Sequence, residues 1–224
     1  MATVELEVEP LMPGDHLARE EFLRRWEARP EIKKAELIWG VVYMPSPLSA
    51  DHGKRDVEVG YWLCHYAMHT PGCEAGQNAT WYMLEDAPQP DCHLRIEREC
   101  GGTSWIENNF FRGAPELAAE VCLSSTSYDL HQKRDLYAAA GVKEYVVVLL
   151  RERQVRWHRL VGGSYQLLPI GPDGVLRSLV FPGLWLDGQA LITGNMLRVL
   201  EVLNQGLASP EHAEFLARLA REIR

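Results

Sequence analysis

The sequence has 224 residues, 46% apolar and 24% charged, so it can form one domain with an extension, or two small domains, around a sizeable core. The formal net charge of −8 argues against the basic surface typical of tight, sequence-independent binding to nucleic acid, although metal-binding carboxylates would themselves add negative charge. No apolar run approaches the roughly 20 residues of a membrane helix, the acidic N-terminus is unlike a signal peptide, and five cysteines without a CxxC pattern indicate reduced thiols in the cytoplasm.

The N-terminal half is expected to alternate between helices and short strands. Apolar residues recur at helical spacing in residues 17–28, and Pro30 then ends the helix. Gly40 lies between two apolar, β-prone runs, which predicts two strands joined by a tight turn within residues 35–44. The other elements expected here are a helix at 50–69, strands at 76–84 and 91–97, and a loop at 99–110.

A strand–helix–strand unit is expected in the middle of the chain. Residues 117–123 and 144–150 are almost continuously apolar, and a helical stretch at 127–140 separates them. Thr126 and Asp129 have the spacing of a capping box at the start of this helix. Continuous apolar strands of this kind are typical of parallel strands that are buried on both faces and joined by a right-handed crossover.

The last third of the chain is expected to continue with antiparallel strands and to end in helices. The strands are RQVRWHRL, SYQLLPI and VLRSLVF, with turns at residues 162–163 and 171–174. In the final helix, Ser209 is the expected N-cap and Pro210 the first helical residue. We therefore expect a mixed α/β fold in which residues 171–224 are a strand and helical extension of the domain formed by residues 1–170.

Glu120 is unusual for its position, because it lies in the middle of the apolar run LAAEVCL. A carboxylate in a buried strand costs several kcal/mol unless a partner or a metal compensates its charge. The alternative is an edge strand with Glu120 in water, which the continuous apolar pattern disfavours. Asp91 after Pro90 and Glu36 at the head of ELIWG are two more carboxylates at strand starts. Taken alone, Asp91 would be read as a turn residue and Glu36 as a strand-end residue on the surface.

Lys133 falls within the apolar stripe of the helix at 127–140, on the same face as Leu130, Tyr137 and Ala140. A crossover helix packs this stripe on the sheet, so the ammonium would lie near the neighbouring strand. The ordinary explanation is a side chain that carries its charge out to water. Arg134 could equally be the residue that points inward.

The three carboxylates and the lysine have a joint explanation in a divalent-metal centre. Mg²⁺ prefers oxygen ligands, often two carboxylates together with waters and a substrate phosphate. Asp91 and Glu120 on neighbouring strands could supply them, with Glu36 as a third ligand. Lys133 could orient the attacking water and offset negative charge that develops on a phosphate.

The chain resembles the Uma-type family, which is labelled as restriction endonucleases within the PD-(D/E)XK superfamily. The matching stretches are AELIWG with MPSP, then His52, then QPDCHLRI, then GAPELAAEVCLSSTSYDLHQKRDLYAAAGVKEYVVV. The resemblance covers residues from about 20 to 160. It implies a restriction-endonuclease-like core and an endonuclease that hydrolyses phosphodiester bonds of DNA with Mg²⁺ or Mn²⁺.

The resemblance also implies a role for each matching residue. Asp91 and Glu120 take the places of the two acidic residues of the motif, and Glu36 that of a further acidic ligand. The motif's lysine would fall at Cys122, so the resemblance implies that Lys133 on the following helix replaces it. His52 matches a histidine that would contact a phosphate or a water molecule. Superfamily nucleases that cut both strands are often homodimers, and apolar residues of the last two helices, from Leu197 to Leu219, could pack on the core or on a second subunit.

Two other functions remain open from the sequence. One is a catalytically silent protein of the same fold that binds nucleic acid or regulates a partner, since fold does not fix function. The other is zinc binding by His65, His69 and Cys73, where the two histidines have the spacing of one helical turn. Packed or solvated histidines explain that spacing at least as well.

Overall fold

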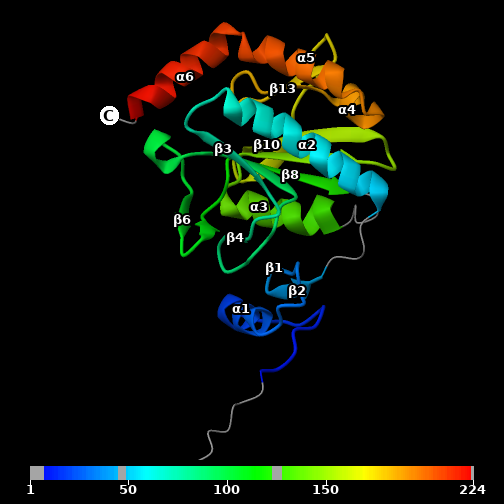
Figure 1. Cartoon of the computed structure of the whole chain (residues 1–224), viewed down its shortest axis with the longest axis vertical. Coiled ribbons are helices and arrows are strands. Elements are labelled where there is room, and N and C mark those ends of the chain that lie inside the picture. Colours follow the sequence, from blue (N-terminus) through cyan, green and yellow to red (C-terminus); the bar gives the residue numbers. More distant parts are fainter. Residues whose placement is uncertain (1–7, 45–48, 123–127, 223–224) are drawn as a thin grey trace, which may run out of the picture.

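A mixed six-stranded sheet forms the centre of the fold in this computed structural model (Figure 1). The structure describes residues 8–44, 49–122 and 128–222, without the side chains of 128–130. In spatial order, the sheet consists of β11 (Ser164–Leu167), β10 (Gln154–Val161), β9 (Glu144–Leu149), β8 (Leu117–Cys122), β5 (Cys92–Ile96) and β3 (Cys73–Gln77).

The two central strands are the expected parallel pair. β8 and β9 run parallel, with Glu120 opposite Val147, and every other neighbouring pair in this sheet is antiparallel. Between them the chain passes through η2 (Tyr128–Lys133) and α3 (Arg134–Ala140). All six residues of each strand are buried, which confirms the prediction made from their continuous apolar pattern.

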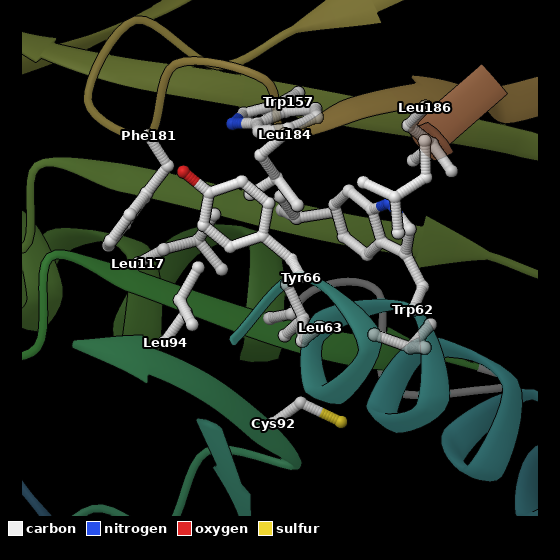
Figure 2. Packing of buried hydrophobic residues seen from close by; sticks show 14 of the residues in the cluster. Trp62, Leu63, Tyr66, Cys92, Leu94, Leu117, Trp157, Phe181, Leu184 and Leu186 are labelled. Carbon is white, nitrogen blue, oxygen red and sulfur yellow. The ribbon is translucent and has the colours of Figure 1, made fainter. Parts of the chain in front are cut away.

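Helices cover both faces of the sheet (Figure 1). The long helix α2 (Ala50–Met68) lies on one face with the C-terminal helices, and α3 lies on the other. Figure 2 shows the hydrophobic core on the α2 side of the sheet, in which Trp62 and Tyr66 of α2 meet the sheet and the C-terminal segment. Both aromatic side chains also satisfy their polar atoms, since Trp62 Nε1 and Tyr66 OH donate to the backbone carbonyls of Trp185 and Pro182.

A small N-terminal unit lies beside the sheet on the α3 side (Figure 1). It contains α1 (Arg19–Glu27) and the hairpin of β1 (Glu36–Ile38) and β2 (Val41–Tyr43). Trp39 and Gly40 at the tip both have positive φ, at 53° and 71°, as a two-residue hairpin turn requires. The Asp86 carboxylate accepts a hydrogen bond from the Gly40 amide at 2.9 Å. This unit carries Glu36 to the α3 side of the sheet.

The C-terminal segment adds three helices to the α2 side, which are α4 (Gly188–Thr193), α5 (Met196–Leu207) and α6 (Pro210–Glu222). The Ser209 hydroxyl accepts a hydrogen bond from the His212 amide at 3.3 Å, as expected of the N-cap. Leu203, Phe215 and Leu219 are buried in the core, whereas Leu197 is 85% exposed. None of the helices among the described residues is both long and apolar enough to cross a membrane.

Several expected elements have different bounds in the structure. The strand predicted at 76–84 is wrong, because β3 ends at Gln77 and Asn78 adopts a left-handed φ of 52° before the two-residue β4 (Trp81–Tyr82). The loop predicted at 99–110 holds η1 (Arg98–Cys100) and a hairpin of β6 (Trp105–Glu107) and β7 (Phe110–Arg112). Asn108 and Asn109 form its turn, both with positive φ.

Two further differences concern the later part of the chain. β12 (Val175–Arg177) pairs with β13 (Trp185–Asp187) and stays outside the main sheet. The helix predicted at 127–140 begins as the π-helical turn η2, and only its second half is α-helical. The proposed capping box falls on Thr126, which lies outside the described residues, so the structure does not test it.

Candidate active site

Glu120 faces the α3 side of the sheet because side chains alternate along a strand. Its neighbours two residues away, Ala118 and Cys122, pack in the core on the α3 side, while Ala119 and Val121 belong to the core under α2. The side chain is almost fully enclosed, with the residue 2% exposed. The alternative of an edge strand with this carboxylate in water is therefore wrong.

Lys133 compensates the charge of Glu120 and of a second carboxylate. Its Nζ lies 2.9 Å from Oε1 of Glu120 and 2.9 Å from Oε1 of Glu36, and the residue is 2% exposed. Arg134, the other candidate for the inward position, is partly exposed and pairs with Asp135. The π-helical turn that ends at Lys133 departs from regular helix geometry directly beside this ion pair, where such turns often mark functional sites.

Tyr137 completes the environment of Glu120, and sequence reasoning missed it as a site residue. Its hydroxyl donates a hydrogen bond of 2.7 Å to Oε1 of Glu120, the same oxygen that Lys133 contacts. Burial and the nearby Glu120 carboxylate raise the pKa of Tyr137 well above its usual value, so the hydroxyl remains a donor. The available signal was its position one helical turn after Lys133, on the same face.

Asp91 lies at the start of β5, beside Glu120 on the neighbouring strand. Cys92, the first residue of β5, pairs with Ala119 in the antiparallel register, so Asp91 directly before it comes next to Glu120. Its Oδ2 accepts a hydrogen bond of 3.0 Å from the Val121 amide. Burial alone would raise the pKa of Asp91, but the ammonium groups of Lys133 and Lys34 and the amide outweigh it, so the pKa is lowered.

Lys34 is a second lysine at the site that the sequence did not indicate. Its Nζ lies 3.2 Å from Oδ1 of Asp91 and 3.0 Å from Oδ1 of Asn78. Burial alone would lower the pKa of Lys34, but the carboxylates of Asp91 and Glu36 outweigh this effect and raise it. The contact with Asp91 joins residues 57 positions apart, which no local pattern reveals.

His52 lies in the first turn of α2, next to Asp91. Its Nε2 is 3.7 Å from Oδ2 of Asp91, which is too long for a direct hydrogen bond. The residue is 8% exposed, and its Nδ1 has no hydrogen-bond partner among the described residues. His52 therefore lies beside Asp91 without a direct hydrogen bond to it.

Glu36 combines a contact to Lys133 with a structural one. The same Oε1 that faces the ammonium accepts a hydrogen bond of 2.7 Å from the Gln89 amide, which ties β1 to the chain before β5. The residue is 6% exposed. The structure thus brings Glu36, Asp91, Glu120 and Lys133 together in one buried cluster, with His52 beside Asp91.

The donor chemistry of the cluster fits a hard divalent cation, because Glu36, Asp91 and Glu120 all offer carboxylate oxygens. Within the described parts of the chain, however, no three His, Cys, Asp or Glu side chains converge closely enough to form a ready-made metal site. Instead, the positive charge between Glu36 and Glu120 is the Lys133 ammonium. Any cation at these carboxylates would share Glu120 with that lysine.

Two other buried glutamates show what a structural carboxylate looks like in this protein. Glu144 accepts hydrogen bonds from the Leu179 amide at 2.8 Å and the Ser178 hydroxyl at 2.7 Å, which fixes the loop after β12. Glu116 accepts one of 2.8 Å from the Ile96 amide. The partners of Glu120 include the side chains of Lys133 and Tyr137, both from the helical crossover between β8 and β9.

The alternative of a zinc site at His65, His69 and Cys73 is wrong, because no metal-binding group of this kind exists among the described residues, which include all three. His65 Nε2 pairs with Asn204 Oδ1 at 2.9 Å, and His69 Nδ1 lies 2.8 Å from the His65 carbonyl. Burial raises the pKa of the Cys73 thiol well above its usual value, which disfavours the thiolate that zinc requires.

Comparisons with known proteins agree with the fold and identify the family. The sequence profile of the Uma2 family, described as "Putative restriction endonuclease", matches residues 19–189. A crystal structure titled as a "putative nuclease" from Anabaena variabilis shares the fold, with a TM-score of 0.62 at 16% identity, over 79% of this chain and 98% of that one. A search of curated proteins finds no match. Because the profile covers well over half of the sequence, the chain belongs to the Uma2 family of restriction-endonuclease-like proteins.

Proposed function

We propose that the protein is a divalent-metal-dependent endonuclease that hydrolyses phosphodiester bonds of DNA. The observation that carries this proposal is the buried cluster in which the Lys133 ammonium lies 2.9 Å from both Glu36 and Glu120, with Asp91 beside Glu120 on the next strand. The family, described as "Putative restriction endonuclease", supports a nucleic acid as the substrate.

The energetic cost of this cluster supports a functional role. Removing several charges from water costs more than their mutual attraction commonly returns, so apolar side chains of similar volume would often stabilise a fold as well or better. Glu144 shows that a buried carboxylate here can be satisfied by backbone amides. Glu120 contacts a lysine and a tyrosine, and a lysine ammonium is suited to offset negative charge on a substrate phosphate.

Asp91, Glu120 and Glu36 would hold the metal ion, with Mg²⁺ or Mn²⁺ matching their oxygen donors. When bound, such an ion supplies Lewis acidity toward a phosphate and lowers the pKa of a water molecule. Asp91 and Glu120 stand on paired strands of the central sheet, which gives them a rigid base.

The protein's own side chains would then act as follows. Lys133 would offset the negative charge that grows on the phosphate as the attacking oxygen approaches. Tyr137 would keep the Glu120 carboxylate in one orientation through its hydrogen bond. His52 would contact a phosphate oxygen or a water molecule beside Asp91, consistent with an Nδ1 that has no hydrogen-bond partner among the described residues.

Cleavage assays test the proposal directly. Supercoiled plasmid and single-stranded DNA are incubated with the purified protein in Mg²⁺ or Mn²⁺, in parallel with Asp91→Asn and with a chelator. Cutting by the wild type that both the substitution and the chelator abolish would support the proposal. A folded wild-type protein that cuts neither substrate with either metal would contradict it and favour a catalytically silent binding or regulatory protein.

A homodimer in the cytoplasm is part of the proposal. Cutting both strands of a duplex needs two centres, and two-fold symmetric dimers are the commonest way to supply them. All five cysteines are free thiols, which supports a reducing compartment. Light scattering measures the mass of the purified protein, which is 25.4 kDa for one chain. If the protein has the mass of one chain both without DNA and when bound to DNA, the dimer is contradicted.

A further inference from the structure

Lys34 contacts the acidic cluster at Asp91, whereas Lys133 lies between Glu36 and Glu120. It precedes Glu36 by two residues, in the segment that leads into β1. Its ammonium contacts Asp91 at 3.2 Å, whereas the ammonium of Lys133 contacts Glu36 and Glu120. Lys34 therefore adds a second ammonium to the cluster, in direct contact with Asp91.

The two lysines differ in their access to solvent. The side chain of Lys133 is 3% exposed, while that of Lys34 is 23% exposed. An ammonium has three N–H donors. Lys34 uses them for the oxygens of Asn78 at 3.0 Å and Asp91 at 3.2 Å, so among the described residues one donor has no partner.

Asn78 holds Lys34 in place. It adopts a left-handed φ of 52°, and its backbone N–H donates a hydrogen bond of 3.1 Å to the backbone carbonyl of Asp91. This fixes the end of β3 against the start of β5, so that the Asn78 side-chain oxygen faces the ammonium of Lys34. A lysine anchored at two points loses less side-chain entropy on binding a ligand than a mobile surface lysine does.

The negative charge of the cluster suggests that Lys34 does more than neutralise Asp91. Asp91 already accepts the Val121 amide, and Lys133 lowers its pKa as well. Three carboxylates against Lys133 alone would repel an approaching phosphodiester, which carries a full negative charge. A partly exposed ammonium at the edge of the cluster counters that repulsion.

We propose that Lys34 is a substrate-binding residue whose ammonium contacts a phosphodiester oxygen of the nucleic acid beside Asp91. This inference rests on the proposed nuclease function. It adds a residue whose positive charge offsets the repulsion between the carboxylates and the negatively charged substrate. The contact is to the backbone, so it carries no information about base sequence.

Binding measured without cleavage tests this contact. Fluorescein-labelled duplex DNA is titrated in EDTA at several salt concentrations, with wild type, Lys34→Gln and Lys34→Arg. Each neutralised phosphate contributes about 0.9 to the slope of log K against log salt for duplex DNA. The matched control is Lys143→Gln, because Lys143 also faces a buried carboxylate, Glu116 at 3.4 Å, at the start of β9.

The expected result is a salt slope smaller by about 0.9 and weaker binding for Lys34→Gln, with Lys34→Arg and Lys143→Gln close to wild type. An unchanged slope in Lys34→Gln would overturn the inference and leave Lys34 as a counter-charge for Asp91. A wild type without measurable DNA binding would overturn it too. Metal-dependent cleavage is assayed separately and tests the nuclease proposal. If the wild type cuts DNA but the salt slope of Lys34→Gln is unchanged, the phosphate contact of Lys34 is rejected and the nuclease proposal stands.

Discussion

Lys133 and Glu120 are 13 residues apart in the sequence, yet Nζ of the lysine lies 2.9 Å from Oε1 of the glutamate in the buried centre of the molecule. The strand β8 supplies the carboxylate, and the crossover helix that returns over the sheet supplies the ammonium. The βαβ unit thus creates the ion pair by its topology alone.

Lys133 should be important for stability as well as for activity. Lys133→Met would leave Glu36 and Glu120 buried and facing each other without their shared counter-charge, and breaking a buried pair costs about 3–5 kcal/mol. Urea unfolding would measure the loss. The exposed neighbour gives the control, since Arg134→Met should change stability by less than about 0.5 kcal/mol. Equal stability of the two variants would mean that the Lys133 ion pairs contribute nothing.

Removing Glu120 as well should recover part of that loss. In Lys133→Met with Glu120→Gln, only one of the two glutamates that contact Lys133 remains charged, and the glutamine can still accept the hydrogen bond of Tyr137. The two substitutions should therefore be coupled by about 1 kcal/mol or more in a double-mutant cycle. Additive effects on the free energy of unfolding would contradict the close contact seen here.

Tyr137→Phe tests the positioning of the Glu120 carboxylate. The substitution removes one buried hydrogen bond, so the free energy of unfolding should fall by about 1 kcal/mol. If the bond also orients Glu120, kcat for DNA cleavage should fall about tenfold while KM stays the same. A loss of stability with an unchanged kcat would assign Tyr137 a purely structural role.

Truncation of Glu144 should destabilise the fold more than truncation of Glu120. Glu144→Ala leaves the Trp157 indole, the Ser178 hydroxyl and the amides of Leu179 and Val180 without their acceptor, which should cost about 3 kcal/mol or more. Glu120→Ala leaves Lys133 paired with Glu36 and should cost less. Thermal unfolding of both variants compares them, and a larger loss for Glu120→Ala would mark Glu120 as the structural carboxylate.

The lowered pKa of His158 should make the free energy of unfolding fall at acidic pH. Burial lowers the pKa of this histidine below 6.5, and Arg134 and Arg156 lower it further. The unfolded chain therefore binds a proton that the folded protein does not, so this stability is present above pH 6.5 and is lost as the pH falls below it. Urea unfolding at pH values around and below 6.5 measures this. The free energy of unfolding should fall less steeply with pH in His158→Phe than in the wild type, whereas His131→Gln, at an exposed histidine, should show the wild-type fall.

The regular parts of the fold follow from the sequence because their signals are local. Continuous apolar runs identify β8 and β9, and Gly40 with its flanking apolar runs identifies the first hairpin. The break after Gln77 depends on the left-handed Asn78, which an apolar pattern does not reveal. The asparagines and glycines of residues 99–110 predicted a loop, although this segment holds the exposed strand β6 and leads into the half-buried strand β7.

The candidate site was only partly predictable for the same reason. Glu120 and Lys133 interrupt apolar patterns, so burial makes each of them anomalous. Lys34 and Tyr137 break no pattern, because one lies before a strand and the other is an ordinary apolar position of a helix. Their roles come from contacts to Asp91 and Glu120 that only the folded chain creates.

The most direct test of the nuclease centre is the single-turnover rate of metal-dependent DNA cleavage by Glu120→Gln. The glutamine keeps an oxygen for Tyr137 and Lys133 and removes only the charge, so the fold should survive. The control is Glu74→Gln, since Glu74 pairs with Arg95 at the partly exposed edge strand β3. We predict a rate at least about 100-fold lower for Glu120→Gln and a wild-type rate for Glu74→Gln. Wild-type cleavage by Glu120→Gln would contradict the account.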